Sequence, residues 1–273
     1  MPLKIGLSKT DITPPIGIFL AGYANRLEPS EGVYLPLTAT AIAIDDGKAE
    51  ALIIGAEILG FYEHTPQVRQ RIGEKTGLQP HQIILNGSHT HCGPVLREVD
   101  RERHGNIDDH YIEQLIEKVA TCAHQAWQNR EPSILKFGTD TCNFAVNRRL
   151  PDENGIFQMR PNPIGPVDHT VSVLAIETPT GQTKGVLFSY ACHPTSRGGL
   201  LIGGDYVGFA LQHIEQNNNL TACFLQGCAG DIKPGPADAT ATTFTPRTIE
   251  QVQAIGEQLG QAVYNILQSQ TLT

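Results

Sequence analysis

The sequence lacks a basic cluster, a long apolar run and an N-terminal leader pattern. Its 20 Lys and Arg residues are outnumbered by 28 Asp and Glu, which gives a net charge of −8. Because binding to a phosphate backbone needs clustered Lys and Arg, we expect no nucleic-acid partner. No apolar run approaches ~18 residues, so we expect no transmembrane segment. Residues Met1 to Ser8 lack the apolar stretch of a signal peptide, and we therefore expect a cytoplasmic protein.

Closely spaced cysteines are also missing. None of the six cysteines forms a Cys-x-x-Cys pair, which argues against a zinc ribbon or a thioredoxin-type motif. Reduced cytoplasmic thiols usually behave as small apolar residues. Cys92 and Cys192 lie beside histidines, and packing and chemical roles both stay open for them. A cysteine-dependent hydrolase that uses Cys228 or Cys92 with a nearby histidine is one interpretation to test.

The 273 residues, 40% of them hydrophobic, suffice for one large core, and we expect a single domain over residues 1–273. The runs Leu37 to Ile44 and Ala51 to Leu59 flank Asp45-Asp46-Gly47, which predicts a hairpin. Apolar periodicity predicts four helices, and short apolar runs predict five further strands. The helices are Pro66–Thr76, Asp108–Asn129, Asp205–Gln216 and Ile249–Leu267; the strands are His81–Asn86, Ser133–Thr139, Val171–Glu177, Lys184–Tyr190 and Ala222–Gln226.

These elements predict an α/β fold with a mixed β-sheet core flanked by helices. The segment Asn143 to Asp168 is rich in Pro, Gly, Asn and Arg, and we expect it to form a long ordered loop. A loop of such length is usually functional.

Two histidine-bearing turns stand about a hundred residues apart. Each is an apolar run that ends in histidine: Ile83 to Pro94 carries His89 and His91, and Val186 to Ser196 carries His193. Sites of α/β proteins usually lie at such strand ends, and imidazole is the commonest metal ligand. In extended backbone, His89 and His91 would point the same way. A pair of hydrogen-bonded turn histidines is the alternative, which the distant His193 makes less attractive.

Imidazole with carboxylate fits zinc best, although other divalent ions are compatible with these residue types. The candidate carboxylates are Glu57, Asp205 and Asp231, which could equally be a solvated strand end, a helix N-cap and a turn-closing residue. Asp231 follows the strand that ends at Gln226. If the three strand ends share one sheet edge, then His89, His193 and Asp231 converge.

A set of short motifs, in a consistent order along most of the chain, resembles the N-terminal, catalytic domain of the neutral/alkaline non-lysosomal ceramidases and their short bacterial relatives. The motifs are Thr10-Asp11-Ile12-Thr13-Pro14-Pro15, Ala21-Gly22-Tyr23, Ser88 to Pro94, Asn147-Arg148-Arg149, Gly165 to Asp168, Cys192 to Ser196, Gly204 to Gly208 and Leu225 to Pro234.

The resemblance implies a ceramidase N-terminal-domain-like fold and a zinc-dependent amidase. It implies that His89 and His193 are zinc ligands, that His91 lines the site and that Arg148 contacts the substrate. We take Asp205 as a third metal ligand, and His91, Arg148 and Asp231 as the catalytic set. The family's further ligands, a Glu and a Tyr, belong to a more C-terminal part, which we expect this chain to lack.

The leading expectation is therefore a metal-dependent hydrolase that cleaves an amide or related bond with metal-activated water. Its substrate would be a small-molecule or lipid-like amide. The alternative is a non-catalytic or truncated domain that acts as a binding module. A homo-oligomer, in which a neighbouring subunit supplies ligands, stays open.

Overall fold

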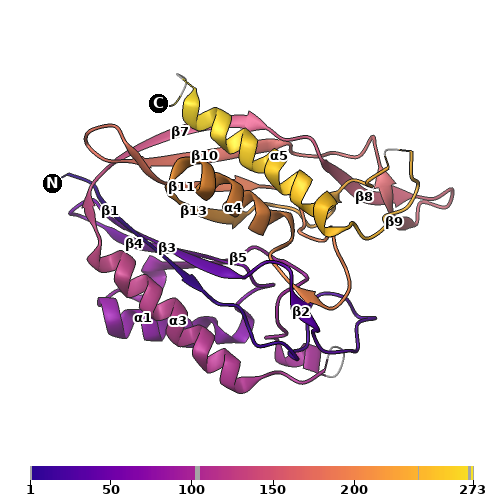
Figure 1. The fold of residues 1–273 in the computed structure, drawn as a ribbon, viewed down its shortest axis with the longest axis horizontal. Coiled ribbons are helices and arrows are strands. Elements are labelled where there is room, and N and C mark those ends of the chain that lie inside the picture. The colour runs from indigo at the N-terminus through magenta and orange to yellow at the C-terminus, as the bar shows by residue number, and fades with distance from the viewer. Residues whose placement is uncertain (1, 102–104, 239, 270–271, 273) are drawn as a thin grey trace.

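The computed structural model describes residues 2–101, 105–238, 240–269 and 272, and these form four layers (Figure 1). Two β-sheets stack face to face, and a pair of helices covers the outer face of each. Helices α1 (Thr65–Thr76) and α3 (Asp109–Gln128) cover the first sheet, and α4 (Asp205–Asn218) and α5 (Ile249–Gln268) cover the second.

The first sheet has the strand order β5-β4-β3-β1-β6, and the second has the order β13-β11-β10-β7. The strands of the first are β1 (Lys4–Asp11), β3 (Thr38–Asp45), β4 (Glu50–Ala56), β5 (Ile83–Gly87) and β6 (Glu131–Pro132). Those of the second are β7 (Ile134–Thr141), β10 (Thr170–Glu177), β11 (Thr183–Tyr190) and β13 (Thr221–Gln226).

The two sheets share one topology. In the first, the antiparallel strands β1, β3 and β4 are followed by α1 and by the parallel edge strand β5. In the second, the antiparallel strands β7, β10 and β11 are followed by α4 and by the parallel edge strand β13. Each edge strand thus enters its sheet through a helical crossover, as parallel pairing requires.

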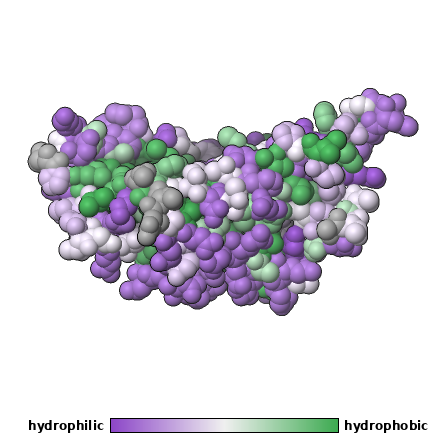
Figure 2. Space-filling view, turned by 90° about the horizontal axis from the view of Figure 1, so that it is seen from above, coloured by the Kyte–Doolittle hydropathy of each residue, from purple (hydrophilic) through white to green (hydrophobic). Residues whose placement is uncertain are grey.

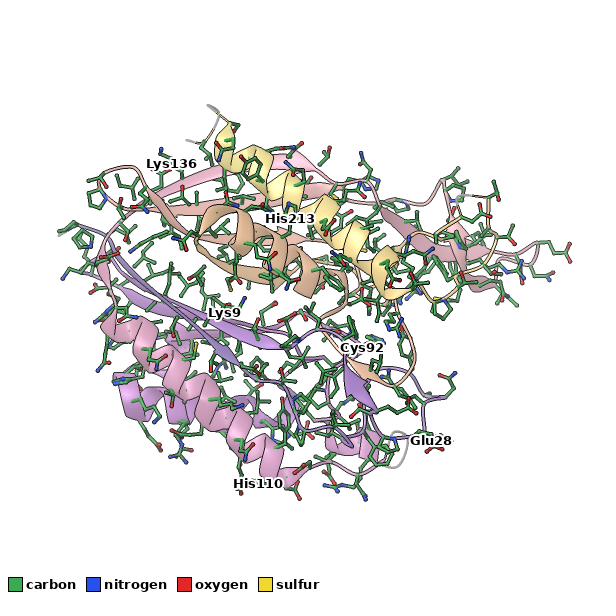
Figure 3. The ribbon with its side chains drawn as sticks, viewed as in Figure 1. Lys9, Glu28, Cys92, His110, Lys136 and His213 are labelled. Carbon is green, nitrogen blue, oxygen red and sulfur yellow. The ribbon has the colours of Figure 1, made fainter. Side chains whose placement is uncertain are left out.

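The stacked sheets bring the ends of the two edge strands together. The backbone N–H of Gln226, the last residue of β13, donates to Asn86 Oδ1 on β5 at 3.0 Å. A small apolar cluster of Ile5, Ile42, Ile176 and Cys223 fills the space between the sheets. Lys9 also lies between the layers, where its Nζ is 2.6 Å from Glu215 Oε2 (Figure 3). Polar turns that follow β5 and β13 are therefore neighbours.

A smaller sheet with the order β14-β8-β9 projects from one end of the molecule (Figure 1). It consists of β8 (Ala145–Pro151), β9 (Phe157–Asn162) and β14 (Ile232–Pro234). The expectation of a loop over Asn143–Asp168 is therefore wrong, because most of this segment is an antiparallel hairpin. Figure 2 shows apolar side chains gathered near this end and a hydrophilic outermost tip.

The remaining elements are short. Strands β2 (Gly32–Val33) and β12 (Leu201–Ile202) pair in parallel. Single 3₁₀ turns occupy Tyr62–His64, Pro80–Gln82 and Glu98–Asp100. Among the described residues, no helix combines the length and the apolar character needed to cross a bilayer.

The mixed α/β fold class is confirmed, and the expected hairpin and helices are present. The expectation that the three polar strand ends share one sheet edge is wrong. β5 belongs to the first sheet, whereas β11 and β13 belong to the second. Convergence is instead produced by the stacking of two sheets.

Candidate metal centre

Three histidines meet on the turns that follow β5 and β11. One ring nitrogen from each of His89, His91 and His193 lies within 4.8 Å of the other two. The ring centroids are 4.7 Å apart for His89 and His193, 5.4 Å for His89 and His91, and 5.6 Å for His91 and His193. We call this group the histidine triad.

The backbone fixes the direction of His89. The residue follows β5 and has a φ of 70°, in the left-handed region that residues with a side chain seldom adopt. Its N–H donates to Ile58 O at 2.9 Å, which ties the turn to the residue just past β4. Strained backbone of this kind clusters at functional sites.

Two triad rings are oriented by backbone carbonyls. His89 Nδ1 lies 2.9 Å from Leu59 O, and His193 Nδ1 lies 2.8 Å from Ala229 O. Because a carbonyl can only accept, Nδ1 carries the proton in both rings and Nε2 keeps its lone pair. Such a second contact commonly orients a metal-ligating histidine.

His91 differs, because neither of its ring nitrogens has a hydrogen-bond partner among the described residues, although both are buried. A buried, unpaired polar group is costly and calls for a partner. The ring packs edge-on against Tyr23 at 4.9 Å between centroids. A metal ion held by the triad would give a His91 nitrogen its missing partner, so the donor set fits a divalent cation.

Burial keeps the triad neutral. Desolvation, followed by repulsion from the neighbouring His89 and His193, lowers the pKa of His91 to about 2. Desolvation lowers the pKa of His193 to about 4, and it also lowers the pKa of His89. Neutral imidazole is the form that binds metal.

Arg148 and Asp231, two of the expected catalytic residues, lie together beside the triad. Arg148 is on β8, and its N–H donates to Asp231 O at 2.7 Å. Its guanidinium donates from Nε and Nη2 to Gly230 O, at 3.2 and 2.6 Å. Asp231 Oδ2 accepts from Asn147 Nδ2 at 2.9 Å. Desolvation lowers the pKa of Arg148, and its charge lowers the pKa of His193.

Asp205, expected as a metal ligand, is not part of the triad. Its Oδ2 accepts from the N–H groups of Ser196 and Arg197 at 2.9 and 3.2 Å, and its Oδ1 accepts from Tyr206 N at 2.8 Å. The carboxylate is fully buried, and that burial raises its pKa. These bonds fasten the segment after His193 to the start of α4, so the structure gives Asp205 a positioning role.

Glu57, another carboxylate considered from the sequence, also lies apart from the triad. Its Oε2 accepts from Thr38 N and Thr38 Oγ1, both at 2.7 Å. The third member of the group that could hold a metal ion is His91, for which the sequence predicted a lining role.

The thiols differ in their access to a substrate. Cys92 is fully buried, and that burial raises its pKa to about 12, so it stays a thiol at neutral pH. This state does not suit a nucleophile. Cys228 is exposed on the loop after β13.

A cavity of 490 Å³ adjoins the triad. Tyr23, which packs on His91, and Thr195, two residues after His193, form part of its wall. Arg26 also lines it, and donates to the backbone carbonyls of Ala21, His91 and Gly199. Tyr23 and Arg26 were not singled out from the sequence. Tyr23 stands in one of the quoted motifs, which is the signal that could have found it.

The chain matches the family model described as neutral/alkaline non-lysosomal ceramidase, N-terminal, over residues 3–258. It is 24% identical to a neutral ceramidase of Drosophila melanogaster, over 98% of this chain and 44% of that protein. It is 21% identical to neutral ceramidase B of Dictyostelium discoideum, over 89% of this chain and 37% of that protein. The crystal structure of neutral ceramidase from Pseudomonas aeruginosa superposes with a TM-score of 0.84 at 20% identity, over 98% and 46%. The chain spans less than half the length of these relatives.

Proposed function

We propose that this chain, which belongs to the neutral/alkaline non-lysosomal ceramidase family, binds one zinc ion at the histidine triad and hydrolyses an amide bond. The observation that carries the proposal is His91, whose two buried ring nitrogens lack a partner beside two histidines with directed Nε2 lone pairs. Three histidines are a common ligand set for catalytic zinc, which keeps one position open.

His89, His91 and His193 hold the ion in this proposal. Zinc at such a site polarises a carbonyl and lowers the pKa of the attacking water. Leu59 O and Ala229 O keep the ring protons of His89 and His193 on Nδ1. The Tyr23 ring covers His91 and excludes water from it.

Arg148 is proposed to stabilise the oxyanion that develops on the scissile amide. Its Nε and Nη2 are held by Gly230 O, which fixes the guanidinium plane. Its Nη1 makes no hydrogen bond to the described residues and is available to a substrate oxygen. A fixed donor of this kind stabilises developing charge without reorganisation. Asp231 completes the proposed catalytic set as the carboxylate beside Arg148.

The relatives are named neutral ceramidases, and we expect a small-molecule or lipid-like amide as the substrate. The alternative is a binding module without catalysis.

The decisive measurement is the metal content of the purified, tag-free chain by mass spectrometry. We expect about one zinc per chain in the wild type, and its loss in His89→Ala, His91→Ala and His193→Ala. His110→Ala is the control, because His110 lies on α3 and bonds to Gln114 instead (Figure 3). Full occupancy in His193→Ala would refute the assigned ligands. A metal-free wild type would favour the binding module.

Activity is then measured as the release of primary amine from N-acylated substrates. We expect a chelator to abolish release and added zinc to restore it. Release that survives the chelator but is lost on thiol alkylation would instead favour the cysteine-dependent interpretation.

A further inference from the structure

The cavity beside the triad carries an excess of positive charge. Its wall includes the three cations Arg26, Arg197 and Lys233 and one carboxylate, Glu28. Glu28 is exposed and lies at the outer edge of the molecule (Figure 3). All the charged side chains that line the inner part of the cavity are therefore cations.

The three cations differ in how many of their donor groups are already hydrogen-bonded within the protein. Arg26 is largely occupied, because its Nη1 and Nη2 donate to three backbone carbonyls and only its buried Nε has no partner among the described residues. Arg197 donates from Nη1 to Arg247 O at 3.4 Å, while its buried Nε has no partner among the described residues. These contacts leave part of the Arg197 guanidinium available to a ligand.

Lys233 has the fewest hydrogen-bonding partners of the three cations among the described residues. Its Nζ makes no hydrogen bond or ion pair with the residues that the structure describes, and lies 4.5 Å from the centroid of the Phe244 ring. Desolvation and the charge of Arg148 lower its pKa, while the charge of Asp205 raises it. Its side chain is partly buried, and an ammonium taken out of water without a direct ion pair is destabilised. A ligand anion would relieve that cost.

The position of Lys233 relates the cavity to the proposed chemistry. It lies on β14, whose Ile232 O accepts from the His193 N–H at 3.0 Å, and it follows Asp231 by two residues. A substrate that presents its amide to the triad can therefore extend a charged end into the cavity.

We propose that this cavity binds a carboxylate of the substrate, with the Lys233 ammonium as its counter-ion and Arg197 as a second donor. The inference rests on the proposed function and narrows it to amides that carry an acidic group, such as N-acyl amino acids. A charged hydrogen bond of this kind contributes about tenfold to a hundredfold in binding.

The test compares two amides that differ in charge, N-hexanoylglycine and N-hexanoylethanolamine. We expect the wild type to favour N-hexanoylglycine by about tenfold or more in kcat/KM. Lys233→Met should bring the ratio of the two kcat/KM values close to one, and Lys233→Arg should retain most of the preference. Lys48→Met, at an exposed turn far from the triad, should keep the wild-type ratio.

A wild type without preference, or a Lys233→Met variant that keeps it, would overturn the inference and leave the amidase proposal intact. If the wild type cleaves neither amide, the amidase proposal fails and calorimetry with N-hexanoylglycine tests the cavity by itself. Binding that weakens about tenfold in Lys233→Met but not in Lys48→Met would then support the carboxylate site. Equal binding by all three proteins would refute it.

Discussion

At the scale of single residues, Gly22 is what allows His91 to sit in the triad. Gly22 has a φ of 97°, and a Cβ built on it would lie 2.3 Å from both Cγ and Nδ1 of the His91 ring. Because Gly22 carries only a hydrogen atom where other residues have a Cβ, the His91 imidazole can fill that space. Glycine also adopts this backbone conformation without the strain that a side chain brings.

Gly22→Ala should lower both stability and zinc affinity. The left-handed backbone should cost about 1–2 kcal/mol, and displacement of His91 should weaken zinc binding by about tenfold or more. Gly17→Ala is the matched control, because Gly17 has a φ of 98° and nothing within 4 Å of the added Cβ. Urea denaturation and a zinc-competition titration measure the two effects. Equal zinc affinity in both variants would contradict the explanation.

Glu57 combines complete burial with half-satisfied hydrogen bonding. Thr38 supplies both donors to Oε2, whereas Oε1 has no partner among the described residues. Desolvation raises the pKa of Glu57 above its ordinary value of 4.5, while Lys9 lowers it and Glu215 raises it further. The folded protein therefore holds this proton more tightly than the unfolded chain does.

A raised folded pKa gives a defined pH dependence. Its contribution to the free energy of unfolding is fully present below pH 4.5 and is lost as pH rises through the folded pKa. Glu57→Gln removes this titration and keeps the acceptor for Thr38. We expect the variant to gain stability relative to the wild type as pH rises from about 4 to 8. Urea titrations across this pH range measure the difference in stability between the two proteins. Lys9 and Glu215 are present in both, so the comparison isolates the effect of Glu57. A difference that is flat or of opposite slope would refute the assignment.

The residue patterns predicted which histidines lie together, but not the backbone conformation that brings them together. Extended backbone was expected to align His89 and His91, but His89 is in the left-handed region. Asp205 was expected at the metal, but three backbone N–H groups bind its carboxylate. Local spacing could not reveal either result, because both depend on segments that only the folded chain brings together.

At the scale of elements, helices α4 and α5 approach closely through glycines. A Cβ on Gly256 would lie 2.6 Å from Tyr206 O and 2.5 Å from Phe209 Cβ on α4. A Cβ on Gly260 would instead meet the His213 side chain, at 2.8 Å from Cδ2 (Figure 3). The Tyr206 carbonyl is part of the α4 backbone and cannot move aside, whereas the His213 side chain can rotate.

The two positions should therefore respond differently to the same substitution. Alanine favours a helix over glycine by about 1 kcal/mol, but overpacking against backbone costs about 1–3 kcal/mol. We expect Gly256→Ala to be destabilising and Gly260→Ala to be close to neutral, as measured by thermal and urea unfolding. Equal changes in the stability of the two variants would contradict this expectation, because they would show that the α4–α5 interface adjusts equally at both positions.

The elements themselves were predictable where their patterns were strong. The four long helices and the hairpin of β3 and β4 follow from apolar periodicity and from Asp45-Asp46-Gly47. The hairpin of β8 and β9 did not follow. Phe157 and Met159 alternate with polar residues along β9, but both are more than 60% exposed, so the alternation does not mark a buried face, and the many Pro, Gly and Asn residues of this segment favoured a loop.

At the scale of the whole molecule, the triad joins the two halves of the fold. His89 and His91 follow the edge strand of the first sheet, and His193 follows β11 of the second. Polar contacts already cross between these strand ends, among them Gln226 N to Asn86 Oδ1 at 3.0 Å and His91 N to Pro194 O at 3.4 Å. A shared metal ion would bind the folded chain and not the separated halves, and it would thereby stabilise the stacked arrangement.

Removal of the metal should consequently lower the melting temperature of the entire chain. An ion present at about a hundred times its Kd contributes about 2.7 kcal/mol, which corresponds to a fall of about 5–10 °C for a chain of this size. Differential scanning calorimetry with and without a chelator measures the fall, and added zinc should reverse it. His110→Ala should respond as the wild type does, whereas His193→Ala should melt at the same temperature in both conditions. A chelator-sensitive His193→Ala variant would locate the stabilising metal outside the triad.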